Sequence, residues 1–174
     1  MIMRNKIRIL NLLALILLIV PAFYLDPFRE NYSHLTIFPL GHFYVLVLAA
    51  SIGITLYLEL AVSSKRQGLA AFFCFMVPAL VAYDEPATLQ ANIHIFLSYA
   101  GFYAIAILHI FNLYLKCFGN AKRLLFARRI TVVLFSITIY SYLNFLCVNT
   151  LSELSFASGI LVSNYLLYIE KTTA

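Results

Sequence analysis

Six apolar segments, separated by short polar or turn-forming stretches, constrain this 174-residue chain more than any other feature. They run over residues 7–25, 40–62, 69–83, 92–115, 130–148 and 154–169. Hydrophobic residues make up 63% of the chain and charged residues 11%, against about a quarter charged in a soluble domain. Lipid must therefore surround most of the chain, and in hydrocarbon each segment has to pair its backbone groups internally as a helix. The sequence predicts an all-α, polytopic bundle of six transmembrane helices, in a single domain over residues 1–174.

The basic residues predict the orientation of this bundle, because Lys and Arg gather in the cytoplasmic loops of membrane proteins. Cytoplasmic N- and C-termini leave only Arg29 outside and place eleven of the twelve basic residues inside. These eleven are Arg4, Lys6, Arg8, Lys65, Arg66, Lys116, Lys122, Arg123, Arg128, Arg129 and Lys171. The stretch from Lys116 to Arg129 is expected to be the largest loop. The first segment is expected to be an uncleaved helix, since its apolar run continues without a small-residue cleavage site.

Charge and cysteine content narrow the classes of function. The net charge of +5 is explained by topology signals, and no basic helix interleaved with aromatic residues predicts a nucleic-acid partner. Cys74, Cys117 and Cys147 form no CxxC pair and fall at different predicted depths. A structural disulfide or zinc knuckle is therefore not expected, whereas a catalytic thiol stays open beside a small buried hydrophobe.

The fourth segment carries a polar stripe. At 100° per residue its members fall within about an 80° arc: His94, Ser98, Gly101, His109 and Asn112. Such a stripe should face the interior of the bundle. It predicts either hydrogen bonds between helices or a lining for a ligand, a lipid headgroup or a proton path.

Glu59 is the one acidic residue well inside an apolar segment. His109 should lie at a similar depth on the fourth helix, so the two side chains are expected to pair away from water. Such a pair is either structural or a proton acceptor. A lone Glu59 at the inner interface is the alternative.

The predicted outer mouth gathers titratable residues from four segments: His34, His42, Asp84, Glu85, His94 and Glu153. Histidines with carboxylates could bind zinc or another divalent metal, and His42 with His94 could hold a haem. No compact metal-binding motif is present, so no metal or other cofactor is assigned. The last segment carries Ser155, Gly159 and Ser163 at intervals of four, which predicts a close helix-packing face. Glu153 and Asn164 align on another face and are expected to point toward the bundle centre.

Two short stretches resemble the Frag/DRAM/Sfk family of six-helix membrane proteins. They are Asn92-Ile93-His94-Ile95-Phe96, and Ser152-Glu153-Leu154 running on to Val162-Ser163-Asn164-Tyr165. The family includes factors for lipid remodelling of GPI anchors and modulators of autophagy. The resemblance implies a role in handling membrane lipids, with His94 and Glu153 as the positions of interest.

These observations predict a multi-pass integral membrane protein that binds or processes lipids or lipid-linked substrates at its extracytoplasmic mouth. The expected catalytic set is His94, Glu153 and Asp84, although whether the chain is an enzyme is left open. Binding residues are expected among the other polar positions of the helices: His42, Ser98, Asn112, Asn164, Glu59 and His109. The alternatives are an accessory subunit that assembles with partner membrane proteins, and a small transporter with a polar path from His94 to His109 and Glu59.

Overall fold

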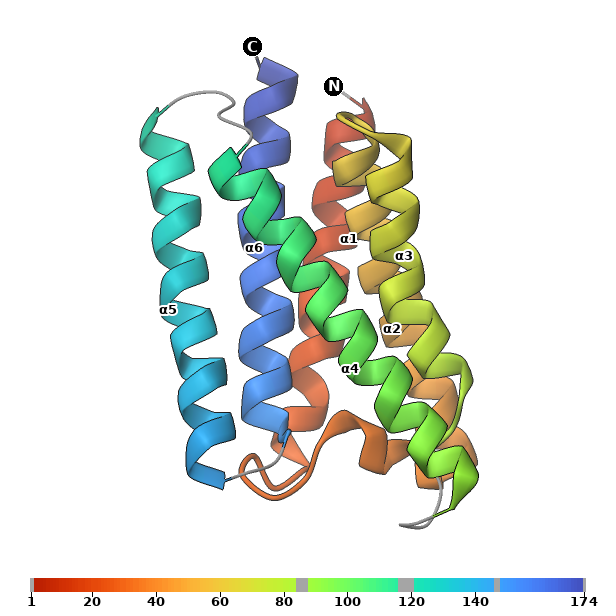
Figure 1. Ribbon diagram of the computed structural model, residues 1–174. Coiled ribbons are helices and arrows are strands. Elements are labelled where there is room, and N and C mark those ends of the chain that lie inside the picture. Colours follow the sequence, from red (N-terminus) through yellow and green to blue (C-terminus); the bar gives the residue numbers. More distant parts are fainter. Residues whose placement is uncertain (1, 84–87, 116–120, 146–147, 174) are drawn as a thin grey trace.

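The computed structural model describes residues 2–83, 88–115, 121–145 and 148–173, and this part is helical without a strand (Figure 1). Its α-helices are α1 (Ile2–Ile19), α2 (Pro39–Ala61), α3 (Lys65–Leu80), α4 (Leu89–Ile110), α5 (Ala121–Phe145) and α6 (Thr150–Thr173). Its shorter elements are the 3₁₀ helices η1 (Val20–Phe23) and η2 (Tyr32–Ile37) and the π-helical turn η3 (Phe111–Leu115). The predicted all-α class is confirmed, and each apolar segment overlaps one of the α-helices.

Polar capping residues explain why several helices begin before their apolar segments. α3 begins at Lys65 because the Ser64 hydroxyl accepts a hydrogen bond from the Gln67 amide at 3.4 Å. α6 begins at Thr150, where the Asn149 side chain accepts from the Ser152 amide at 3.0 Å. Such caps satisfy amide groups that have no partner in the first helical turn. The apolar pattern alone therefore places these boundaries too late.

The expected loop from Lys116 to Arg129 is wrong over most of its length. α5 begins at Ala121, so residues 121–129 form its first turns, while residues 116–120 lie outside the described part. Lys and Arg are good helix formers, so a basic stretch that marks topology can still be helical. The Arg128 side chain also packs over the Tyr114 ring, at 4.9 Å from its centroid, and donates to the Leu113 carbonyl at 3.0 Å.

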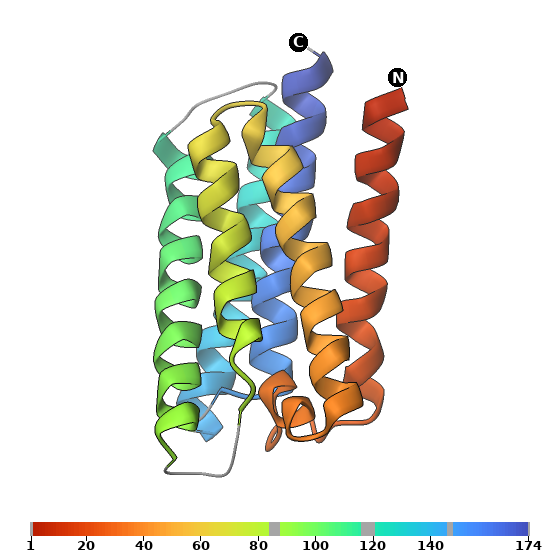
Figure 2. The ribbon, with the colours of Figure 1, turned by 90° about the vertical axis from the view of Figure 1, so that its right-hand side faces the viewer.

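Two views show the arrangement of the helices (Figures 1 and 2). α1 begins and α6 ends at the same end of the bundle, which we call the terminal end, and α2 connects to α3 there. The opposite end, which we call the loop end, carries η2 and the beginnings of α4 and α6. Consecutive α-helices thus run in alternating directions between the two ends.

α6 is the central helix and α5 is a peripheral one. α6 contacts α1, α2 and α5, and every side chain from Leu151 to Tyr168 is buried or half-buried. The predicted packing face of α6 is confirmed, because a side chain at Gly159 would press against Leu134 of α5 at 3.2 Å. α5 instead exposes Val132, Val133 and Leu143 among other large apolar side chains. Exposed apolar side chains of this size suit contact with lipid.

Four helical stretches of the described residues are long and apolar enough to cross a membrane: Asn5–Phe23, Pro39–Ala61, Leu89–Tyr114 and Lys122–Phe145. They are compatible with a membrane protein by length and composition. α3 spans 16 residues, about 24 Å at 1.5 Å per residue, and is short against a hydrocarbon core of about 30 Å. α6 is long but carries buried serine and asparagine residues.

Candidate site at the loop end

Two adjoining cavities enter the bundle at the loop end. The first, which we call the vestibule, has a volume of about 420 Å³ and a polar wall that includes Arg29, Glu30 and His34. The second, which we call the apolar chamber, has a volume of about 170 Å³ and a wall formed mainly by aliphatic and aromatic side chains of α2, α3, α4 and α6. The cavities share five lining residues: Ser33, His94, Ser98, Phe102 and Glu153. These five residues therefore form the boundary between the vestibule, which has charged side chains on its wall, and the apolar chamber.

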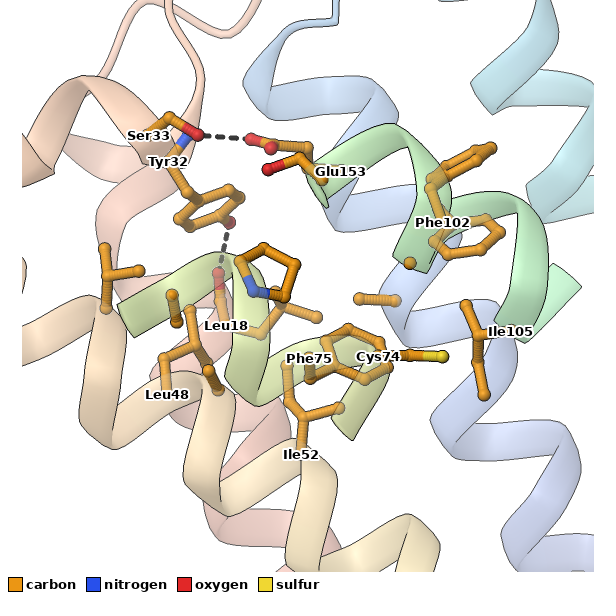
Figure 3. A pocket seen from close by; sticks show the side chains of 18 of the residues that line it. Leu18, Tyr32, Ser33, Leu48, Ile52, Cys74, Phe75, Phe102, Ile105 and Glu153 are labelled. Carbon is orange, nitrogen blue, oxygen red and sulfur yellow. Dashed lines mark hydrogen bonds between the residues drawn. The ribbon is translucent and has the colours of Figure 1, made fainter. Parts of the chain in front are cut away.

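The chamber has a polar end and an apolar end (Figure 3). Tyr32, Ser33 and Glu153 lie together at the polar end, and Ile52 lies at the apolar end. Phe102 and Ile105 of α4 form one side of the chamber. An amphipathic molecule could therefore place its polar group in the vestibule and its apolar part in the chamber.

α4 can line this space because it crosses α3 at a glycine. Pro78 of α3 has no amide hydrogen, so the Cys74 carbonyl lacks its usual helical partner. Gly101 of α4 lies against this carbonyl oxygen, and a Cβ atom at Gly101 would collide with it. Glycine is therefore required for the close approach that positions the rest of α4, including His94 and Ser98.

His94 is held by hydrogen bonds on both ring nitrogens. Nδ1 lies beside the backbone carbonyl of Val81, and Nε2 lies 2.7 Å from the Ser33 hydroxyl. A carbonyl oxygen only accepts hydrogen bonds, so Nδ1 carries the hydrogen and donates it to Val81. In the neutral ring Nε2 is then an acceptor, and the Ser33 hydroxyl donates to it. His94 is 4% exposed, and the Tyr83 ring packs edge-on against it at 5.8 Å between centroids.

Ser33 is positioned by the short helix η2. The Asn31 side chain caps η2 by accepting from the His34 amide at 3.1 Å, and the Thr36 hydroxyl donates to the Ser33 carbonyl at 2.7 Å. Ser33 was not among the predicted site residues, because it lies in a connection between apolar segments, where serine is common. Only the return of this connection over the start of α4 brings its hydroxyl to His94.

Glu153 joins the start of α6 to η2. One of its carboxylate oxygens accepts a hydrogen bond from the Tyr32 amide at 2.7 Å. The Tyr32 hydroxyl in turn donates to the Leu18 carbonyl of α1. Burial, and then the nearby Glu153 carboxylate, raise the pKa of Tyr32. Tyr32 therefore stays neutral at physiological pH, and Glu153 anchors the residue next to Ser33.

The other predicted residues of the mouth have separate locations. His42 donates from Nε2 to the Ala79 carbonyl at 2.9 Å, which ties α2 to α3, and it lines neither cavity. His34 lines the vestibule and lies 3.6 Å from the Glu30 carboxylate. Asp84 and Glu85 lie outside the described residues. Among the residues described, no three His, Cys, Asp or Glu side chains are grouped as metal ligands.

The predicted inward direction of the α4 stripe is confirmed, because His94, Gly101, His109 and Asn112 are buried and Ser98 is half-buried. The predicted pairing of Glu59 with His109 is not formed. Glu59 accepts from the Asn11 side chain of α1 at 3.0 Å. This difference arises because α1 packs against α2 and supplies a closer partner than α4.

His109 instead joins α4 to α5 and α6. Its Nε2 lies 3.1 Å from the Thr131 hydroxyl and 2.9 Å from the Ser163 hydroxyl. Asn112 of η3 and Asn164 of α6, both 3% exposed, are buried in the half of the bundle toward the terminal end. Within the described residues, one carboxylate oxygen of Glu59 and the amide oxygen of Asn112 are buried without a hydrogen-bond partner.

A stack of three aromatic rings lies between His109 and the loop-end cavities along α4 and α6. Phe156 stacks on Phe102 at 3.8 Å and on Phe135 at 5.2 Å between centroids. Ile105 of α4 extends this apolar region and is 2% exposed. The polar stripe of α4 is thus divided into two parts, and a continuous polar path from His94 to His109 is not formed by these residues.

Comparison of the chain with protein-family models, with curated proteins and with solved structures found no match. The loop-end cavities and the long apolar helices are therefore the features that bear on function.

Proposed function

We propose that this chain is a six-span membrane protein that binds a lipid or lipid-linked substrate at its extracytoplasmic mouth. The polar group of the ligand occupies the vestibule, and the first carbons of its apolar chain occupy the chamber. The observation that carries this proposal is the boundary formed by Ser33, His94, Ser98, Phe102 and Glu153, which line both the vestibule with its charged side chains and the apolar chamber.

The proposed topology extends the four apolar helices to six spans with cytoplasmic termini. α3 lies along α2, and α6 lies among α1, α2 and α5, so both pass through the same layer as their neighbours. Lower hydropathy of α6 is expected, because a central helix contacts protein rather than lipid. Lys65, Arg66, Lys122 and Arg123 belong to helix ends at the terminal end, which supports a cytoplasmic assignment for that end.

The size and lining of the cavities support an amphipathic ligand. A chamber of about 170 Å³ is comparable to an apolar protein cavity of about 150 Å³ that binds benzene. It therefore fits a segment of several carbons rather than a whole lipid. The rest of the chain would leave between α4 and its neighbours, where exposed apolar side chains such as Tyr99 and Tyr103 line the surface.

Arg29 supports a polar group that carries negative charge. It is exposed on the wall of the vestibule, and a guanidinium binds phosphate through two parallel hydrogen bonds. The same role in handling lipids is implied by the resemblance of the His94 and Glu153 stretches to the Frag/DRAM/Sfk family. We extend that resemblance to this chain as part of the proposal.

The small-residue face of α6 was the main sequence feature that favoured an accessory subunit, and the fold places it inside the bundle. The small-residue face formed by Ser155, Gly159 and Ser163 is buried inside the bundle. This face packs within the chain, so it offers no surface to partner membrane proteins. Such partners would have to bind elsewhere on the bundle.

Cross-linking with a photoactivatable phospholipid tests the proposal. The protein in lipid nanodiscs would be irradiated with a lipid that carries a diazirine near the carbonyl end of its acyl chain, and adducts would be located by peptide mass spectrometry. We expect adducts on α3, α4 and α6 around the chamber. Ser98→Leu, which fills the boundary, should reduce them about tenfold, which corresponds to about 1.4 kcal/mol.

Ala104→Leu is the matched control, because Ala104 lies on the same helix and is exposed. It should leave the chamber adducts unchanged. Adducts spread evenly over exposed helix faces, with no effect of Ser98→Leu, would overturn the proposed binding site.

A further inference from the structure

A hydroxyl group and an unprotonated imidazole nitrogen meet at the boundary between the two cavities. The Ser33 Oγ and His94 Nε2 atoms are 2.7 Å apart, within the range for a nucleophile and its general base. The Val81 carbonyl accepts from Nδ1 and so fixes the tautomer that leaves Nε2 free to take a proton. An orienting acceptor on the far nitrogen is the third part of a Ser–His arrangement.

Ser33 and His94 come from different parts of the chain. Ser33 belongs to η2, His94 to the second turn of α4, and Val81 follows α3. The neighbouring residue, Tyr32, is held through its amide by Glu153 of α6. Three independent contacts therefore fix the relative positions of hydroxyl and imidazole. This arrangement is more than a single hydrogen bond that ties a loop to a helix.

Both reactants of an ester cleavage would have access to this pair. Ser33 is half-buried and lines the vestibule and the chamber. An acyl chain in the chamber would place its carbonyl group near the boundary. Water or an acceptor hydroxyl would arrive through the vestibule. Glu153 also lines both cavities, where it holds the Tyr32 amide next to Ser33.

We propose that Ser33 is the nucleophile, and His94 its general base, in the cleavage or transfer of an acyl ester of the bound lipid. This inference rests on the proposed function, since the lipid site supplies the substrate. Ser33 Oγ forms a bond to the ester carbonyl carbon while its proton passes to His94 Nε2. The bond from that carbon to the ester oxygen then breaks, and the released alcohol takes the proton from His94.

The second half of the reaction regenerates the serine. Water, or the hydroxyl of an acceptor lipid, attacks the acyl group on Ser33 and gives its proton to His94. The bond between Ser33 Oγ and the acyl carbon then breaks, and Oγ recovers a proton from His94. The products are an alcohol and either a free fatty acid or a transferred acyl ester, and no oxidant or reductant is consumed.

A long-chain alkyl fluorophosphonate tests the pair directly. In its reaction with an activated serine, Oγ bonds to phosphorus, fluoride leaves, and the serine proton passes to the base. We expect one adduct per wild-type chain, located on Ser33 by peptide mass spectrometry. Ser33→Ala should remove it. His94→Gln should slow labelling at least about a hundredfold, as loss of a general base does.

Ser158→Ala is the matched control. The Ser158 hydroxyl donates within α6 to the Leu154 carbonyl at 2.6 Å and lines neither cavity, so labelling should be unchanged. Thermal melting by circular dichroism would confirm that each variant is folded. If Ser33→Ala does not fold, the labelling rate of His94→Gln and the mapped position of the wild-type adduct still test whether Ser33 is the nucleophile and His94 its base.

Lipid cross-linking in the same samples separates the two proposals. Labelling at Ser33, with cross-links to the chamber retained in Ser33→Ala, would support both. Absence of labelling in a wild-type protein that still cross-links lipid at the chamber would overturn the acyl-transfer inference and leave the lipid site standing. Labelling at another serine would also overturn it. Absence of both signals would overturn both proposals.

Discussion

Polar side chains border cavities in one half of the bundle and are packed between helices in the other half. At the loop end, Ser33, His94 and Glu153 border two cavities, and their hydrogen bonds join η2 to α4 and α6. In the half toward the terminal end, Glu59 and His109 are each 1% exposed and lie among packed helices. Glu59 pairs with Asn11, and His109 contacts the hydroxyl groups of Thr131 and Ser163.

This difference separates the roles of similar residues. Burial of a polar group without a cavity beside it serves to join helices, because each group must find a partner or cost free energy. A polar group that borders a cavity can exchange its partner for water or a ligand. Changes in the terminal half should therefore reduce stability, whereas changes at the loop end should chiefly reduce binding or chemistry.

The largest effect is expected from the aromatic stack that divides the two halves. Phe156→Ala removes a ring that is 5% exposed and should cost about 3–5 kcal/mol of the free energy of unfolding. It should also open the terminal half to water, so that a cysteine replacing Ser163 reacts with a soluble maleimide from the loop end. Titration with SDS in mixed micelles measures the stability.

Phe126→Ala is the control for this change, since Phe126 is 55% exposed on α5. Its effect should be within about 0.5 kcal/mol. A cysteine at position 163 that stays unreactive in Phe156→Ala would show that the stack is not what separates the halves.

The next largest effect concerns the Asn11–Glu59 pair. Glu59→Leu leaves the Asn11 amide, which is 5% exposed, with the Leu161 carbonyl as its remaining partner at 3.2 Å. The cost should be roughly 1–3 kcal/mol. Replacement of both residues by leucine should recover much of this loss, since two apolar side chains leave no polar group unpaired.

A double-mutant cycle on the SDS unfolding free energies measures this coupling. Strictly additive losses from the two replacements would contradict a structural pair and favour separate roles for Asn11 and Glu59.

A smaller effect is the difference in unfolding free energy that we expect between alanine variants of the two histidines on α4. His109→Ala leaves a closed space and removes the contacts of α4 with the Thr131 and Ser163 hydroxyl groups, and should cost roughly 1–3 kcal/mol. His94→Ala should cost about 1 kcal/mol less, because water from the vestibule can reach the Ser33 hydroxyl and the Val81 carbonyl. The same SDS titration compares both variants. Equal losses would remove the distinction between the halves on which the candidate site depends.

The smallest effect on stability is expected at Arg29, which is exposed at the vestibule. Arg29→Gln should change the unfolding free energy by less than about 0.5 kcal/mol. It should weaken cross-linking of an anionic phospholipid a few-fold, and added salt should narrow this difference by screening. An equal loss of cross-linking for a lipid without a charged headgroup would show that Arg29 does not recognise the headgroup charge.

The sequence by itself determined the helical class, the approximate helix positions and the inward direction of the α4 stripe. These follow from apolar periodicity and from the need to pair backbone groups, both of which are local properties. Helix starts were less predictable, because Ser64 and Asn149 act through caps that apolar patterns do not report. The helical start of α5 was missed because the charge of its Lys and Arg residues indicates topology rather than conformation.

Only the tertiary structure decided which polar residues meet. Asn11 rather than His109 pairs with Glu59, because partner choice depends on the packing of α1 against α2, which no spacing in the chain reveals. Ser33 reaches His94 because the connection after α1 folds back over the start of α4, across 61 positions of sequence. The division of one polar stripe into a cavity lining and a closed network likewise depends on where Phe102, Phe135 and Phe156 stack. Such contacts are set by the relative positions of whole helices, and a single sequence carries no direct record of them.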